Sequence, residues 1–385
     1  MHDRTHWTRR IEAAWQRRPL VWLTGVRRSG KTVLCRSLRD VEYLDCELPS
    51  VRRAVAEPEA FLRSLGTRRV VLDEVHRLDD PSQLLKIATD HFPKVQLVAS
   101  GSSTLQASRK FRDTLTGRKV EVLLTPMMSA DLVAFNDTNL VHRLGRGGLP
   151  PFFLCAELIE ADFQEWMDSY WARDIQELFR LNRRGSFLRF VELLLVQSGG
   201  LFDASKLATP CEVSRPTIAS YLNMLELTRV AHVLRPFAER RRSEIVATPK
   251  VYGFDTGLVA YYRGWRDLHP SELGQLWEHY VLNELQARLP QTEIRYWRDT
   301  RHHEVDFVLA PRGRAPIAIE CKWTADGRDD LPGLAAFRRA YPQGPSFVVA
   351  PSVTRAFTRH LGRDEIAIDY VNLETLVERL LATRT

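Results

Sequence analysis

The chain reads PLVWLT over residues 19–24 and GVRRSGKT over residues 25–32. The second segment fits the pattern G-x-x-x-x-G-K-[ST] at every fixed position, and the first is an apolar run as long as a buried strand. Residues 32–38 indicate the first turns of a helix. A strand, a glycine loop and a helix N-terminus together present backbone N–H groups to phosphate. These residues therefore predict a phosphate-binding loop in an α/β fold.

Each residue type in this loop has an expected task. Gly25 and Gly30 let the backbone approach the phosphates, and Lys31 reaches the β- and γ-phosphates. The hydroxyl of Thr32 is expected to ligate Mg²⁺. Ser102, after a later apolar run, is a candidate sensor of the γ-phosphate. The candidate nucleotide-binding residues are Gly25, Arg27, Arg28, Ser29, Gly30, Lys31, Thr32, Val33 and Ser102.

A second motif lies where a nucleotide hydrolase needs it. Residues 69–73 read RVVLD, an apolar strand that ends in Asp73 and is followed by Glu74. Ligands of an open α/β sheet sit at the carboxyl ends of its parallel strands. Asp73 is therefore expected to hold Mg²⁺, directly or through water, and Glu74 to polarise the attacking water. Arg118 is a candidate arginine finger, and an ordinary surface arginine is the alternative.

Composition limits the remaining choices. The chain has 385 residues, which favours two to four domains, and its hydrophobic content of 44% is ordinary for a soluble protein. No apolar run approaches the roughly 20 residues of a membrane span, and the first residues lack the apolar core of a signal peptide. Five scattered cysteines without a C-x-x-C pair fit a reducing cytoplasm. A net charge of +7 permits a nucleic-acid partner without requiring one.

The order of apolar runs suggests four domains. Residues 1–125 alternate strands and helices, residues 126–180 are helical and aromatic, and a winged helix and a further α/β domain are expected at 181–248 and 249–385. The aromatic stripe of the second part fits a core better than a platform for bases. One βα unit fits between the phosphate-loop strand and the Asp-Glu strand. The strands expected in the first domain are 20–24, 41–45, 69–73, 95–100 and 120–124.

Residues 185–240 have the pattern of a winged helix. Helices are expected at 187–196, 204–208 and 214–226, and wing strands at 230–234 and 245–248. The apolar face of the third helix is expected to pack inward, so its other face would meet the major groove of DNA. An arginine-rich wing suits phosphate contacts, although such a fold can also serve only protein packing. The candidate DNA-binding residues are Arg215, Thr217, Ser220, Arg240, Arg241 and Arg242.

The last third of the chain carries a second set of chemical groups. Residues 304–309 and 317–323 indicate two strands of a hairpin, which places Asp306 across from Glu320 and Lys322. Two carboxylates can bind Mg²⁺, and a lysine can position water and offset phosphate charge, as a metal-dependent phosphodiesterase needs. Glu278, on a preceding helix, is a candidate further ligand. A structural ion pair or a fold without activity is the alternative.

The motifs together resemble a known family. They include the residues at 25–32, LDE at 72–74, LTGR at 115–118, KVY at 250–252, DTGL at 255–258 and EVDF at 304–307. The chain resembles prokaryotic AAA+ ATPases whose C-terminal half is a domain of unknown function with a restriction-endonuclease-like PD-(D/E)XK fold. The resemblance implies a parallel-sheet ATPase domain that binds ATP and Mg²⁺, a winged-helix middle and a nuclease-like α/β end. It also implies a ring of about six or seven subunits, in which Arg118 reaches a neighbour's nucleotide.

These features leave alternative functions open. The first is an ATP-dependent enzyme that grips DNA with its winged helix and cuts it with Mg²⁺. The second is a nucleotide-dependent oligomeric switch or DNA-binding adaptor with an inactive nuclease fold. The third is a signalling ATPase that contacts only proteins and has no salt-dependent affinity for DNA.

Overall fold

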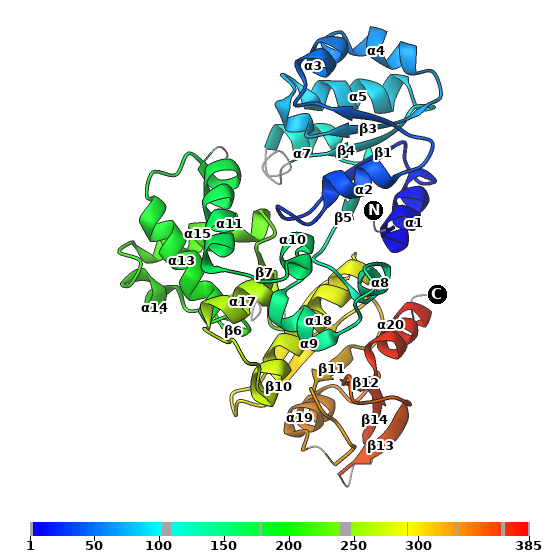
Figure 1. Ribbon diagram of the computed structural model, residues 1–385. Coiled ribbons are helices and arrows are strands. Elements are labelled where there is room, and N and C mark those ends of the chain that lie inside the picture. Colours follow the sequence, from blue (N-terminus) through cyan, green and yellow to red (C-terminus); the bar gives the residue numbers. More distant parts are fainter. Residues whose placement is uncertain are drawn as a thin grey trace. The chain divides into compact units, whose positions relative to one another are not determined.

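The computed structural model describes residues 3–101, 109–176, 179–238, 248–290, 292–328, 330–362 and 366–383 (Figure 1). The chain forms two compact units, and neither is one continuous segment. Unit 1 contains residues 1–139, 148–188 and 222–230, and unit 2 contains residues 140–147, 189–221 and 231–385. Among the described residues, no helix has the length and apolar character needed to span a membrane. The domain limits predicted at residues 125, 180 and 248 stay predictions.

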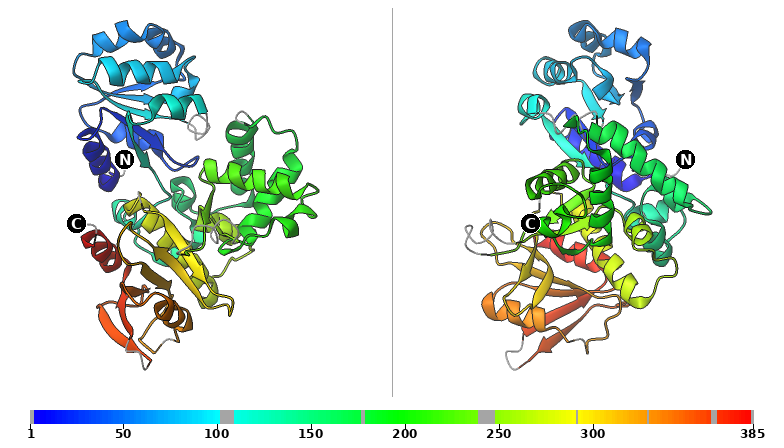
Figure 2. Two further views of the ribbon diagram at one scale, coloured as in Figure 1. Left: turned by 180° about the vertical axis from the view of Figure 1, so that it is seen from behind. Right: turned by 90° about the vertical axis from the view of Figure 1, so that its left-hand side faces the viewer.

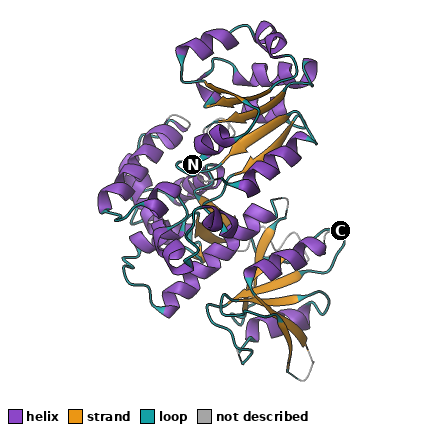
Figure 3. Ribbon diagram, turned by 45° about the vertical axis from the view of Figure 1, so that its right-hand side comes forward, coloured by secondary structure: helices purple, strands orange, loops and turns teal. Residues whose placement is uncertain are grey.

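Unit 1 is built on a five-stranded parallel sheet with the order β2-β3-β4-β1-β5. Figure 3 shows its strands as orange arrows between helices. Most residues of the three central strands, β1, β3 and β4, are apolar and buried, as in parallel sheets that are covered on both faces. β2, α3 and α4 lie between β1 and β3 in the chain, as expected, whereas β4 lies between these two strands in the sheet. The strands are β1 (Leu20–Thr24), β2 (Glu42–Asp45), β3 (Arg69–Asp73), β4 (Gln96–Ser100) and β5 (Lys119–Leu123).

Helices cover both faces of this sheet. Trp22, Leu72 and Leu97 belong to the core on one face, together with apolar residues of α4, α5 and α7. α1 contacts β1 and β5, and α2 contacts β3 and β4. The helices are α1 (Thr5–Trp15), α2 (Lys31–Ser37), α3 (Pro49–Val55), α4 (Pro58–Leu65), α5 (Pro81–His91) and α7 (Arg109–Leu115), with a 3-10 turn, η1 (Val75–Arg77), after β3.

The helical segment after the sheet belongs largely to unit 1. Phe163, Trp166 and Tyr170 are buried, as expected for a core stripe, and the rings of the last two stack with centroids 5.3 Å apart. A π-helical turn, η2, follows α11 directly. Such turns are rare in proteins, and those that occur often lie at functional sites. The elements are α8 (Ser129–Ala134), α10 (Pro150–Leu154), α11 (Glu160–Tyr170) and η2 (Trp171–Gln176), with α9 (Leu140–Arg146) in unit 2.

The middle of the chain contains helices and a three-stranded antiparallel sheet with the order β6-β8-β7. The three helices lie where the sequence predicts them. The strand that pairs with β7 begins at Lys250, later than the expected 245–248, of which only residue 248 is described. The elements are α13 (Arg184–Val196), β6 (Gly200–Leu201), α14 (Ala204–Ala208), α15 (Arg215–Leu227), β7 (Ala231–Leu234) and β8 (Lys250–Gly253).

The rest of unit 2 is a six-stranded mixed sheet with the order β13-β14-β12-β11-β10-β9. Leu334 and Phe337 of α19 pack with Val305 and Val348 on the sheet, while α18 contacts β11 and α20 (Figure 2). β10 and β11 form the predicted hairpin. The elements are α17 (Thr256–Tyr262), α18 (Pro270–Arg288), β9 (Ile294–Arg298), β10 (Glu304–Leu309), β11 (Ile317–Cys321), α19 (Pro332–Ala340), β12 (Ser346–Val349), β13 (Phe357–Leu361), β14 (Ile366–Val371) and α20 (Leu373–Ala382).

Candidate nucleotide site and acidic pocket

The loop between β1 and α2 has the geometry of a phosphate cradle. Gly30 has a φ of 94° directly before the first residue of α2, a left-handed conformation that favours glycine. A Cβ added to Gly25 would overlap the carbonyl oxygen of Leu124, so this position also requires glycine. The ammonium of Lys31 donates to the carbonyl oxygens of Gly25 and Val26 at 2.8 and 3.1 Å. The ammonium of Lys31 is therefore held inside the loop by neutral carbonyl partners.

A cavity of about 400 Å³ opens beside this loop, within the size range of small-molecule pockets. Two of its residues, Val33 and Leu154, are large apolar side chains about half exposed. The hydroxyl of Ser29 is buried and has no hydrogen-bond partner among the described residues. The lining residues are Gly25, Arg27, Arg28, Gly30, Lys31, Thr32, Val33, Glu74, Pro150, Pro151, Leu154 and Asp174. The cavity thus combines cationic, hydroxyl and apolar groups, which a nucleotide requires.

Asp73 and Glu74 lie at the carboxyl end of β3, next to the loop. The carboxylate of Asp73 is buried and accepts hydrogen bonds from the hydroxyls of Ser100 and Tyr43, the latter at 2.7 Å. Glu74 has a φ of 55°, and its carboxylate lies 3.1 Å from the Nδ1 of His76. Glu74 lines the cavity with Lys31 and Thr32, as the sequence predicts.

Charged groups of both signs surround the loop. Burial lowers the pKa of Lys31, an effect that the carboxylates of Glu74 and Asp174 oppose. The hydrogen bond with His76 is the main reason why the pKa of Glu74 lies below its ordinary value. Glu74 is therefore ionised at neutral pH, as an acceptor for a water proton must be. The ammonium of Lys31 donates its hydrogen bonds to backbone carbonyl oxygens, and a phosphate would give it a charged partner.

Two arginines of the loop are already paired with carboxylates. The Nε of Arg27 donates to Asp174 at 2.9 Å, and Arg28 forms an ion pair with Glu165. Asp174 lies in the π-helical turn η2, is 4% exposed and lines the cavity. The sequence pattern assigned it no role, because no local spacing links it to the loop. The geometry places a negative charge where a phosphate would approach Arg27.

Asp174→Asn is expected to raise the affinity for ATP about tenfold. The carboxylate competes with phosphate for Arg27, and a hydrogen bond between charged groups contributes about 1.5 kcal/mol, which corresponds to a factor of about ten. The measurement is titration with a fluorescent ATP analogue. Glu165→Gln is the matched control, since its side chain is 67% exposed, and it should change the affinity little. A weaker affinity in Asp174→Asn would show that this carboxylate supports the ligand instead.

Three of the described candidate residues, Ser29, Asp73 and Arg118, are not in the lining of this cavity. Ser102 lies outside the described residues. Arg118 precedes β5 at the amino edge of the sheet, where Lys119 pairs with Leu20 at the start of β1. The loop follows the other end of β1, about 16 Å away at 3.3 Å per residue. Arg118 instead binds both carboxylate oxygens of Asp90, at 2.8 and 3.0 Å, and cannot reach the nucleotide of its own chain from there.

The predicted recognition helix has the expected faces. Ile218 and Leu225 of α15 are buried, whereas Arg215 and Ser220 are exposed and Thr217 is half-buried. The Ser214 hydroxyl accepts from the N–H of Thr217 at 3.4 Å, as an N-cap does. The exposed face is therefore available for phosphate or base contacts. The wing residues Arg240, Arg241 and Arg242 lie outside the described residues.

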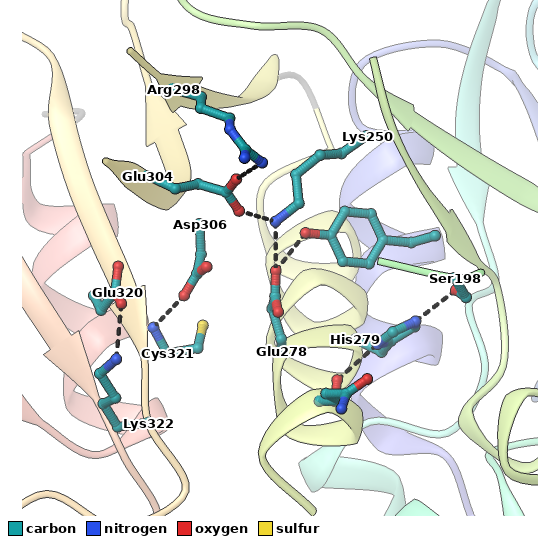
Figure 4. A network of polar contacts seen from close by, with 12 residues as sticks. Ser198, Lys250, Glu278, His279, Arg298, Glu304, Asp306, Glu320, Cys321 and Lys322 are labelled. Atoms are coloured by element: carbon teal, nitrogen blue, oxygen red, sulfur yellow. Dashed lines mark hydrogen bonds and ion pairs between the residues drawn. The ribbon is translucent and has the colours of Figure 1, made fainter. Parts of the chain in front are cut away.

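A second cavity, of about 410 Å³, lies in unit 2 and gathers the predicted carboxylates. Glu278 of α18, Asp306 of β10 and Glu320 of β11 all line it (Figure 4). Asp306 accepts a hydrogen bond from the N–H of Cys321 at 2.8 Å, and the ammonium of Lys322 donates to Glu320 at 2.9 Å. The structure thus brings together all four side chains that the sequence predicts for this site. We call this cavity the acidic pocket.

Burial and like charge set the pKa values in the acidic pocket. Burial, followed by the charges of Glu278 and Glu320, raises the pKa of Asp306 well above its ordinary value. Burial also raises the pKa of Glu320, and Lys322 partly offsets this effect. Raised values of this kind indicate carboxylates that a cation would stabilise in their ionised form.

The donor set of the acidic pocket suits a hard cation, but it is incomplete as arranged. Carboxylate oxygens are the ligands that Mg²⁺ prefers, and the Oε2 of Glu320 is buried without a hydrogen-bond partner in the described part of the chain. Within that part, no group of three His, Cys, Asp or Glu residues is placed to hold a metal ion. Glu278 is instead engaged by Lys250 and Tyr252, two residues to which the sequence pattern assigned no role.

Three family models match consecutive parts of the chain. Residues 17–133 match an AAA domain, residues 137–269 match the domain of unknown function DUF8612, and residues 273–367 match the domain of unknown function DUF4143. The first match confirms the AAA domain that the motifs predict. The other two matches carry no stated activity, so the winged-helix and nuclease-like assignments stay predictions.

Similar proteins have been found in bacteria and archaea. The chain is 29% identical over 330 residues to uncharacterized protein Rv2008c of Mycobacterium tuberculosis and to uncharacterized protein Mb2031c of Mycobacterium bovis. Each match covers 82% of this chain and 73% of the relative. The Walker-type ATPase PABY2304 of Pyrococcus abyssi is 18% identical, with a TM-score of 0.43 over 68% of this chain and 96% of that chain. A complex of Thermococcus gammatolerans McrB AAA+ hexamers with McrC is 12% identical, with a TM-score of 0.24 over 52% and 53% of the two chains.

Proposed function

We propose that the AAA domain of residues 17–133 binds and hydrolyses ATP. The observation that carries this proposal is the cavity beside the loop, where Lys31, Thr32 and Glu74 face one space. Lys31 would bind the β- and γ-phosphates, and Glu74 would orient and deprotonate the attacking water. The loop N–H groups at the start of α2 would bind the phosphates further.

Mg²⁺ and the adenine base fit the remaining groups of the cavity. The Thr32 hydroxyl and the Asp73 carboxylate at the end of β3 would hold the cation, which would neutralise charge on the phosphates. Val33, Leu154 and the two prolines at 150–151 form the apolar part of the lining. Burying such surface against the base would contribute to affinity, at about 25 cal/mol per Å².

Lys31→Ala is expected to abolish binding of ATP at concentrations that saturate the wild type. The change removes the half-buried ammonium that lines the cavity beside the loop. Isothermal titration with ATP and Mg²⁺ measures the binding, and a phosphate-release assay measures the turnover. Lys86→Ala, on the surface helix α5, is the control and should leave both unchanged. Wild-type binding in Lys31→Ala would contradict the assigned role of the loop.

A second function, a Mg²⁺-dependent nuclease, is favoured by the acidic pocket. Asp306 and Glu320 would bind the cation, and Lys322 would position water and offset phosphate charge. The observation that supports it is the convergence of these side chains on one cavity with an unsatisfied buried oxygen of Glu320. The alternative remains a nucleotide-dependent switch or adaptor that retains this fold without cutting.

Asp306→Asn is expected to abolish cleavage of DNA while leaving ATP hydrolysis intact. Asparagine has nearly the same shape as aspartate but lacks the charge that binds the cation. Asp306 lies outside the AAA domain, so ATP hydrolysis should be unaffected. The assay uses linear, circular and four-way branched DNA with ATP and either Mg²⁺ or Mn²⁺. Asp299→Asn serves as the control, since this carboxylate lies at a turn bound to His303. Equal cleavage by wild type and variant, or none by either, would favour the switch or adaptor.

We also propose that DNA and further copies of this chain are its partners. Arg215, Thr217 and Ser220 of α15 supply the exposed polar face that DNA contact needs. If they bind phosphate, Arg215→Ala should reduce the dependence of DNA affinity on salt concentration. An unchanged salt dependence would exclude Arg215 as a phosphate contact.

Arg118 would act on a neighbour's nucleotide in a ring of six or seven subunits. Analytical ultracentrifugation with ATP tests the ring, and a monomer at all concentrations would exclude it.

A further inference from the structure

A cation that the protein itself supplies lies beside the acidic pocket and binds one of its carboxylates. Lys250 is 4% exposed, and its Nζ donates to Glu304 at 2.6 Å and to Glu278 at 3.2 Å (Figure 4). The hydroxyl of Tyr252 also donates to Glu278. Because alternate residues of a strand lie on one side, both donors project from the same side of β8. One strand therefore directs two hydrogen bonds at one carboxylate.

These two bonds hold Glu278 toward β8. In Figure 4, Asp306 lies between Glu320 and Glu278, and the carboxylate of Glu278 faces the ammonium of Lys250. The described residues contain no three-ligand group, although three carboxylates line the cavity. Glu278 would complete such a group only by exchanging the ammonium of Lys250 for another cation.

The charges in and around the pocket support this exchange. Four carboxylates and three cationic groups lie in the pocket or pair with its residues, and the guanidinium of Arg263 also acts on Glu278. The carboxylates are Glu278, Glu304, Asp306 and Glu320, and the cationic groups are Lys250, Arg298 and Lys322. Removal of one buried positive charge leaves carboxylates without a partner and increases their attraction for a divalent cation.

We propose that Lys250, supported by Tyr252, is a latch that holds Glu278 away from the divalent cation of the acidic pocket. Asp306 and Glu320 would hold the cation, Mg²⁺ or Mn²⁺, and Glu278 would join them only after leaving Lys250. The inference rests on the proposed nuclease function, since it concerns the cation of that site. Lys250 acts through Glu278 and is therefore a positioning residue. Because it lies in β8, the three-stranded sheet takes part in the state of the pocket.

The experiment measures binding of Mn²⁺ to the full chain by the electron paramagnetic resonance signal of free Mn²⁺, without nucleotide or DNA. Lys250→Met keeps an unbranched stem beside the rings of Tyr252 and Tyr296 and removes the charge. We expect it to bind Mn²⁺ at least tenfold more tightly than the wild type. Tyr252→Phe removes one neutral hydrogen bond to Glu278 and should tighten binding a few-fold. Adding Asp306→Asn to either variant should abolish the gain.

The outcomes separate the latch from the nuclease proposal. One outcome is that the wild type binds Mn²⁺, Asp306→Asn does not, and folded Lys250→Met binds it no more tightly than the wild type. This outcome overturns the latch but supports the metal site. Absence of Mn²⁺ binding in the wild type and in every variant overturns both. If Lys250→Met does not fold, Tyr252→Phe decides the question, because it changes no charge. An affinity equal to that of the wild type in this variant would overturn the latch.

Discussion

Glu74→Gln is expected to bind ATP with wild-type affinity and to hydrolyse it between about 10²- and 10⁴-fold more slowly, the usual loss when a general base is removed. The change keeps the size of the side chain and its place beside Lys31. It removes the negative charge that the hydrogen bond with His76 maintains. An amide cannot accept the proton of the attacking water. Binding and turnover should therefore separate in this variant.

The measurement combines nucleotide titration with single-turnover hydrolysis, so that slow chemistry is not mistaken for slow product release. Glu47→Gln is the matched control: it makes the same chemical change on the surface of unit 1, where Glu47 meets Arg77 at 3.5 Å. Its turnover should equal that of the wild type. Turnover in Glu74→Gln within fivefold of the wild type would exclude this carboxylate as the base.

Arg4→Met is expected to lower the free energy of unfolding of unit 1 by about 3–5 kcal/mol, the usual cost of breaking a buried ion pair. Arg4 is buried, and its guanidinium donates to both oxygens of Asp131 at 2.9 and 2.7 Å. Its third donor group binds the carbonyl oxygen of Ser29 at 2.8 Å. The variant leaves the buried charge of Asp131 without its cationic partner, while the indole N–H of Trp7 and the backbone N–H of Met128 still donate to it. It also removes a support of the phosphate loop.

Urea unfolding measures the loss of stability, and hydrogen exchange of residues 5–15 and 25–32 measures the loss of support for the loop. The affinity for ATP should fall as well. Arg9→Met, an exposed position of the same helix, is the control and should change stability by less than about 0.5 kcal/mol. Faster exchange in Arg4→Met confined to residues 5–15 would show that the Ser29 contact does not order the loop.

The sequence was most informative where a local pattern decides the structure. The loop at residues 25–32, its two flanking elements and the positions of Asp73 and Glu74 follow from spacing and from runs of apolar residues. The hairpin that brings Asp306 near Glu320 follows from two strands around a short turn. In each case, neighbours in the chain or in one hairpin make the contact, so alternation and turn residues are sufficient to predict it.

Local sequence patterns do not predict contacts between residues that are far apart in the chain. Asp174 pairs with Arg27 across 147 positions, and Asp131 pairs with Arg4 across 127. Lys250 had been identified only as part of a family motif, without a partner. Each is a buried charge whose partner the tertiary fold selects, and no periodicity records that choice. A charged residue within an otherwise apolar or helical stretch, such as Asp174 after Trp171, is the only local signal.

The interleaved course of the chain has a consequence for dissection of the protein. A fragment limited to residues 17–133 would contain the whole AAA match but would lack Arg4, Pro150 and Asp174. It would lose the support beneath the loop and one wall of the nucleotide cavity together. Cuts at single points therefore divide each unit rather than separating the two. Catalytic competence is a property of distant segments joined in three dimensions, and point substitution rather than truncation is the suitable tool.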